Sequence, residues 1–151
     1  MKYIAENLRQ TAKIAADFAL NLSLTTNKAT VVGLYGELGS GKTSFTQSVS
    51  TVLGVTETVV SPTFVIEKIY ELPKTKTDGQ KNVFKHLIHI DAYRLEKSNE
   101  LLSLGWPEII KDESNLILIE WPERVTDIMP EHIRINFYHT KENQREIEII
   151  R

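Results

Sequence analysis

The feature that most constrains how this chain can fold is the stretch at residues 36–43, which reads Gly-Glu-Leu-Gly-Ser-Gly-Lys-Thr. It matches G-x-x-x-x-G-K-[ST], the pattern of a loop that holds phosphate groups. Glycines let such a loop curl until several backbone N–H groups point inward, and the following helix adds its free N-terminal amides and the positive end of its dipole. Because the loop needs a strand before it and a helix after it, the motif predicts an α/β chain.

The residues that close the motif each suit one part of a magnesium–nucleotide complex. We expect Lys42 to reach the β- and γ-phosphates and the Thr43 hydroxyl to bind Mg²⁺. Ser44, one residue into the helix, is placed to meet the α-phosphate. The remaining loop residues expected to contact the nucleotide are Gly39, Ser40 and Gly41.

The rest of the chain supports this arrangement. Residues 31–35 and 116–119 are continuous apolar runs, typical of neighbouring buried strands. The other predicted elements are helices at 6–22, at 42–53 with Gly54 ending it, and at 95–104, hairpin strands at 64–70 and 84–90, and an antiparallel pair at 133–138 and 145–150. The polar connector at 73–82 is expected to be mobile. We predict one domain, residues 1–151, with a P-loop NTPase fold: a mainly parallel central sheet, antiparallel flanking strands and helices on both faces.

Composition excludes several kinds of site. The chain has no cysteine, so disulfides, thiolate metal sites and a cysteine nucleophile are excluded. The N-terminal residues lack a signal-peptide pattern, and no apolar run approaches the roughly 18–20 residues that span a bilayer, so we expect a cytoplasmic protein with no membrane partner. A protein that holds RNA tightly by itself is usually basic, whereas the formal net charge here is −2. If RNA is involved, we expect a partner to hold it.

Two acids follow predicted strands and are candidates for catalysis together with Lys42. Asp91 comes directly after the strand at 84–90, and Glu120 ends the run at 116–119. A carboxylate at such a strand end can face bound Mg²⁺. Either acid could contact the metal while the other orients the attacking water. Trp121 lies beside Glu120 and is a candidate contact for the nucleotide, with a place in the core as the alternative.

The histidines near Asp91 do not suggest a metal site. His86 and His89 are three residues apart in a predicted strand, so their side chains should point to opposite faces. We interpret both as structural.

The sequence favours ATP over GTP. The only Asn-Lys pair, Asn27-Lys28, precedes the loop and lacks the Asp of a guanine-reading motif. A small-molecule kinase remains an alternative, although the connector at 73–82 carries lysines and no arginine that could serve a lid. A regulatory module that binds ATP without hydrolysing it is a second alternative.

Four motifs in this order resemble the TsaE (YjeE) family. They are the loop at 36–43, Ser-Pro-Thr-Phe at 61–64, His-Ile-Asp-Ala-Tyr-Arg at 89–94 and Glu-Trp-Pro-Glu at 120–123. The resemblance implies a cytosolic, Mg²⁺-dependent ATPase that works with TsaB and TsaD to make threonylcarbamoyladenosine at adenosine 37 of tRNAs reading ANN codons. It also implies that TsaD performs the transfer, that ATP hydrolysis permits repeated turnover, and that tRNA is reached only through the complex.

The resemblance also implies roles for individual residues. Thr43 and Glu120 would be the metal contacts, and Thr63 would sit in a switch-like loop that senses the metal or the γ-phosphate. Thr11 and Arg145 would approach ATP, Thr11 from the adenine side; without the resemblance we would place both on the solvated surface. Lys42, Asp91 and Trp121 match family positions at the nucleotide. The connector at 73–82 is an insertion relative to the family pattern, which puts local partner contacts there in doubt.

Overall fold

The computed structural model describes residues 1–60 and 65–151. In chain order its elements are β1 (Lys2–Ala5), α1 (Leu8–Leu20), β2 (Thr30–Tyr35), α2 (Lys42–Val52), β3 (Glu67–Glu71), β4 (His86–Asp91), α3 (Ser98–Leu102), α4 (Trp106–Ile109), β5 (Asn115–Glu120), the 3-10 helix η1 (Pro122–Val125), β6 (Ile133–Lys141) and β7 (Gln144–Ile150). Among the described residues no helix is both long and apolar enough to cross a membrane.

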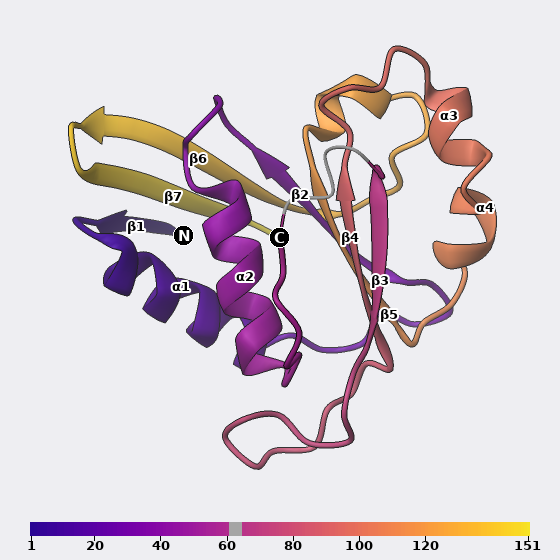
Figure 1. The fold of residues 1–151 in the computed structure, drawn as a ribbon, viewed down its shortest axis with the longest axis horizontal. Helices are drawn as coiled ribbons and strands as arrows, with labels where there is room; N and C mark the ends of the chain where they lie inside the picture. The colour runs from indigo at the N-terminus through magenta and orange to yellow at the C-terminus, as the bar shows by residue number, and fades with distance from the viewer. Residues whose placement is uncertain (61–64) are drawn as a thin grey trace.

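The strands form one seven-stranded sheet in the order β1-β7-β6-β2-β5-β4-β3 (Figure 1). β6, β2, β5 and β4 run parallel to one another, while β1, β7 and β3 pair antiparallel at the two flanks. Every residue of β5, and all of β2 except its last, is buried. This burial explains the continuous apolar runs, because a central parallel strand is covered on both faces. The predicted fold class, with β2 and β5 as neighbours, is confirmed.

Helices cover both faces of the sheet. On one face α1 and α2 pack against side chains such as Val32 and Leu34, and Phe45 of α2 lies between Phe18 and Phe137 at ring-centroid distances of 5.7 and 5.5 Å. On the other face α3, α4 and η1 cover the alternate residues of the central strands. Figure 1 shows α1 and α2 side by side and α3 and α4 near the opposite end of the view.

The structure differs from the predicted elements in three places. Residues 2–5 form an edge strand, β1, that was not predicted. The helix expected at 95–104 is shorter, because α3 ends before Gly105, whose φ of 86° belongs to the left-handed region, and α4 follows as a separate helix. The first hairpin strand begins at Glu67, and Phe64 lies outside the described residues.

The connector at 73–82 has defined contacts with the rest of the chain. It folds back onto the C-terminal end of α2, where the Thr77 amide donates to the Val52 carbonyl at 3.1 Å. The Asn82 side chain, which is 7% exposed, donates to the Leu53 carbonyl at 2.9 Å. These carbonyls belong to the last turn of the helix and have no partner within it. The connector therefore caps the end of α2 opposite to residues 36–41.

Candidate functional site

The loop at 36–41 has the backbone that its glycines allow. β2 ends at Tyr35 and α2 begins at Lys42, so the loop joins a buried strand directly to a helix N-terminus. Gly41, with φ of 106°, is the residue from which α2 starts. A Cβ built on Gly36 would lie 2.7 Å from the Phe137 carbonyl oxygen, so only glycine fits there. The backbone is thus shaped as a cradle of amides at the N-terminal end of α2.

Lys42 lies at the centre of this cradle and is only 5% exposed. Its ammonium donates to the carbonyl oxygens of Gly36 and Glu37 at 2.6 and 2.8 Å. It also lies 4.2 Å from the centre of the Trp121 ring, a cation–π distance. Burial lowers the pKa of Lys42, and the nearby carboxylate of Glu120 opposes part of that shift. A partly desolvated cation at this point is a strong attractor for an anion.

The two acids predicted at strand ends lie side by side. Asp91 of β4 and Glu120 of β5 are register partners on adjacent parallel strands, and they are 4% and 3% exposed. The Thr43 hydroxyl donates to Glu120 Oε1 at 2.9 Å, which joins the start of α2 to the sheet. Asp91 Oδ1 accepts from the Tyr93 amide at 3.0 Å. One hydroxyl and two carboxylates therefore meet beside the Lys42 ammonium.

This donor set fits Mg²⁺. Hard cations take oxygen ligands, and Mg²⁺ in nucleotide sites uses one or two carboxylates or hydroxyls and completes its shell with phosphate oxygens and water. Among the described residues no three His, Cys, Asp or Glu side chains group as a complete metal site. An ion held by Thr43, with Glu120 and Asp91 close by, would accordingly need oxygens from a bound phosphate.

Two cavities meet at the loop. One, of about 350 Å³, is lined by loop residues together with Asp91, Glu120 and Trp121. The other, of about 850 Å³, extends from the loop toward the start of α1 and the turn between β6 and β7, and its lining includes Thr11 and Arg145. Both cavities are lined by Gly39, Gly41 and Ser44. The two cavities therefore adjoin at the loop, and we call the pair the trough.

Most predicted site residues therefore come together in space. The smaller cavity is lined by Gly39, Ser40, Gly41, Lys42, Thr43, Ser44, Asp91, Glu120 and Trp121. Thr11 is 4% exposed, so the expectation of a surface position from the sequence pattern alone was wrong. Its hydroxyl donates to the Asn7 carbonyl at 3.4 Å. Thr11 and half-buried Arg145 both line the larger cavity. Thr63 lies outside the described residues.

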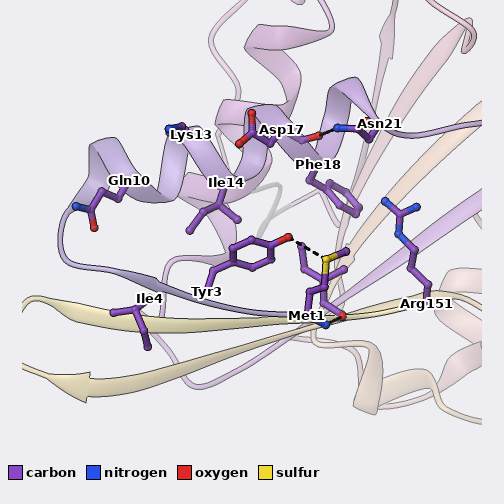
Figure 2. Close-up of a pocket in the computed structure, with 11 residues that line it drawn as sticks. Met1, Tyr3, Ile4, Gln10, Lys13, Ile14, Asp17, Phe18, Asn21 and Arg151 are labelled. Carbon is purple, nitrogen blue, oxygen red and sulfur yellow. Dashed lines mark hydrogen bonds between the residues drawn. The ribbon is translucent and has the colours of Figure 1, made fainter.

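A third cavity, of about 720 Å³, lies between α1, β1 and the end of the chain, away from the loop. Figure 2 shows Ile14 and Phe18 pointing from α1 toward Tyr3, whose hydroxyl donates to Met1 Sδ at 3.3 Å. Lys13 and Asp17 lie on the side of the helix away from Tyr3. The polar side chains that line this third cavity do not converge on one point, in contrast to those that line the cavities at the loop.

Comparison with known proteins decides the family. The family model described as "Threonylcarbamoyl adenosine biosynthesis protein TsaE" matches residues 5–147. The chain belongs to the TsaE family. A TsaE protein from Bacillus subtilis is 33% identical over 94% of this chain and 78% of its own length, and one from Haemophilus influenzae is 33% identical over 85% and 75%. The crystal structure of Bacillus subtilis YdiB matches with a TM-score of 0.73 and 30% identity, covering 97% of this chain and 82% of that one. This TsaE chain is thus linked to threonylcarbamoyladenosine biosynthesis in tRNA.

His89, which was interpreted as structural, is fully buried, and its Nε2 atom lies 3.3 Å from Glu120 Oε1. The sequence interpretation did not predict this contact. Side chains two residues apart on a strand share a face, so His89 had to lie on the same face as Asp91. The two-residue spacing of His89 and Asp91 could be seen in the sequence. The register of β4 against β5, which brings His89 to Glu120, could not.

Proposed function

We propose that this chain binds ATP and Mg²⁺ in the trough over residues 36–44 and hydrolyses ATP in support of tRNA threonylcarbamoylation. One observation carries the proposal: the Thr43 hydroxyl meets Glu120 Oε1 at 2.9 Å, directly beside the buried Lys42 ammonium. Two separate segments, 42–43 and the end of β5, thus bring a cation beside oxygen atoms of the kind that bind Mg²⁺. Family membership supports the link to tRNA modification.

Lys42 is the residue proposed to hold the β- and γ-phosphates. Its ammonium now donates to two neutral carbonyls, at 2.6 and 2.8 Å. Phosphate oxygens are stronger acceptors than carbonyl oxygens, because both partners of the hydrogen bond are then ionised. The amides of the loop and of the first turn of α2 surround the same anion, and Ser44 is placed for the α-phosphate.

Thr43 and Glu120 are the residues proposed to hold the metal, and Asp91 lies beside them. Bound Mg²⁺ would neutralise charge that builds up on the phosphate oxygens during hydrolysis. Asp91 and Glu120 are both buried strand-end acids, and either can accept a hydrogen bond from the attacking water. In the reaction the water oxygen forms a bond to the γ-phosphorus, the bond to the bridging oxygen of ADP breaks, and the proton of the water passes to the released phosphate.

Thr11 and Arg145 are proposed to approach the rest of the nucleotide. They line the larger cavity on the far side of Ser44 from the acids, which is the direction in which the ribose and base would extend from the phosphates. Arg145 supplies a planar cation that can stack on a base or pair with a phosphate.

We further propose that the protein works in the cytoplasm with TsaB and TsaD. In this arrangement TsaD transfers the threonylcarbamoyl group to adenosine 37 of tRNAs reading ANN codons, and ATP hydrolysis by this chain allows repeated turnover. The formal charge of −2 supports indirect contact with tRNA through the complex, because tight direct binding favours a basic surface.

The deciding experiment measures ATP hydrolysis by the purified protein with and without TsaB and TsaD. Hydrolysis that rises when both partners are present supports the proposal. Equal rates in the two conditions contradict the partner-dependent role. A screen with labelled ATP and candidate acceptors separates hydrolysis from the alternative of a small-molecule kinase, and intact ATP after long incubation with the partners would favour a non-catalytic regulator.

Nucleotide binding is expected to change the fluorescence of Trp121. The ring lies 4.2 Å from the Lys42 ammonium, which a bound phosphate would attract away from it. The other tryptophan, Trp106, is 1% exposed and packs on the opposite face of the sheet, where it donates to the Ile128 carbonyl. Titration with ATP should therefore change the emission of the unmodified protein, and Trp121→Phe should remove most of that change. A full response in Trp121→Phe would show that the nucleotide binds elsewhere.

A further inference from the structure

His89 is an imidazole with no contact to solvent. Its side chain is 0% exposed in the middle of the sheet, and Nε2 lies 3.3 Å from Glu120 Oε1. Within the described part of the chain, its other nitrogen, Nδ1, is buried and has no hydrogen-bond partner. Burying a polar ring costs free energy that hydrogen bonds must offset. Glu120 is the one described group that does so here.

The strand register brings these two residues together. His89 pairs with Leu118 of β5, and the next residue on the same face of each strand is Asp91 on β4 and Glu120 on β5. His89 is therefore diagonal to Glu120 and one step deeper in the sheet than Asp91. A side chain at this position cannot reach the trough itself, and it can act on a ligand only through Glu120.

The hydrogen bonds at Glu120 have a defined direction. With Glu120 as a carboxylate, which only accepts, the tautomer of His89 that carries its hydrogen on Nε2 is the donor. The Thr43 hydroxyl donates to the same oxygen, Oε1, at 2.9 Å. Two donors from different elements thus fix Oε1, and they orient the carboxylate as a whole.

We infer that His89 is a positioning residue that holds the Glu120 carboxylate in the orientation needed for magnesium binding and ATP hydrolysis. This inference rests on the proposed function, because Glu120 must serve the metal for its orientation to matter. Groups that orient a metal-binding side chain from behind typically contribute 10- to 100-fold to metal affinity or activity.

The test compares four variants of the full-length protein. His89→Leu removes both nitrogens, and His89→Asn places an amide near Nδ1, too short to reach Glu120. His89→Gln carries an N–H donor near the position of Nε2. His86→Leu is the matched control, because His86 lies on the opposite face of the same strand and bonds to Asn115 at 3.2 Å.

We expect His89→Leu and His89→Asn to lower kcat and to raise the Mg²⁺ concentration for half-maximal hydrolysis, each by roughly 10- to 100-fold, with the KM for ATP nearly unchanged. His89→Gln and His86→Leu should stay within about 3-fold of the unmodified protein. Calorimetry supplies a readout that does not depend on activity. The affinity of His89→Asn for ATP without Mg²⁺ should equal that of the unmodified protein, and the increase in ATP affinity on adding Mg²⁺ should be smaller.

Each outcome bears on a different statement. If the unmodified protein neither binds nor hydrolyses ATP, the proposed function fails. If it is active and His89→Asn matches His86→Leu in kcat and Mg²⁺ dependence, the inference about His89 is wrong. If His89→Leu does not fold, as thermal unfolding would reveal, the comparison of His89→Asn with His89→Gln tests the inference. Both side chains are amides, and only that of glutamine is long enough to reach Glu120. An equal loss of kcat in His89→Asn and His89→Gln would contradict positioning through the Nε2 hydrogen bond.

Discussion

Replacing Lys42 with methionine is expected to weaken ATP binding by roughly 30- to 100-fold, corresponding to about 2–3 kcal/mol for the loss of hydrogen bonds to charged groups. Methionine keeps an apolar stem of similar length, so it preserves contact with the Trp121 ring and removes the charge. In the unmodified protein the ammonium lies within 2.8 Å of two loop carbonyls, at the point where the proposed phosphates would bind. Calorimetric titration with ATP in the presence of Mg²⁺ measures the effect, and hydrolysis should fall in parallel.

The control for this substitution is Lys28→Met, which changes the net charge by the same amount on the surface. Lys28 is paired with Glu131 at 3.0 Å and lines neither cavity at the loop. It should bind ATP as the unmodified protein does. Unchanged ATP affinity in a folded Lys42→Met protein would mean that the loop does not hold the triphosphate.

Replacing Glu120 with glutamine is expected to lower kcat by about 100-fold or more while ATP binding without Mg²⁺ is retained. The amide oxygen of glutamine can still accept from Thr43 and His89, so the substitution tests the negative charge and leaves the geometry in place. Loss of that charge should also raise the Mg²⁺ concentration needed for half-maximal hydrolysis. Steady-state rates over a range of ATP and Mg²⁺ concentrations give kcat and the Mg²⁺ dependence, and calorimetric titration gives ATP binding without Mg²⁺.

Two comparisons make the Glu120 result specific. Glu131→Gln, at a side chain that is 90% exposed, controls for the loss of one surface carboxylate. Asp91→Asn separates the two buried acids: the acid that orients water should affect kcat alone, and the acid that serves the metal should also shift the Mg²⁺ dependence. Unchanged hydrolysis in Glu120→Gln would remove Glu120 from the catalytic group.

Sequence reasoning worked where local chemistry determines structure. The loop at 36–43 was predicted with its flanking strand and helix because a glycine-rich phosphate cradle has strict backbone requirements. β5 was recognised as a neighbour of β2 because a strand covered on both faces must be apolar throughout. Asp91 and Glu120 followed from the same reasoning, since parallel strands end at one edge of the sheet.

The features that were missed depend on pairing between distant segments. β1 has only four residues and forms by pairing with β7, where Tyr3 meets Ile147 from the far end of the chain. Thr11 is covered in the folded molecule, yet the residues beside it on the first helix give no sign of this. The contact between His89 and Glu120 needs the register of β4 against β5, and the apolar runs of the two strands allow more than one register.

The connector at 73–82 also changes how length differences among related chains should be understood. By its polar composition it resembles a surface loop that could be shortened without cost. Yet it supplies the amide of Thr77 and the side chain of Asn82 to the carbonyls that end α2, and Pro73 packs within 2.6 Å of where a Cβ on Gly54 would lie. A shortened chain would have to satisfy those oxygens with water or with a redesigned turn. The connector thus completes the C-terminal end of α2, and deleting it should destabilise that end of the helix.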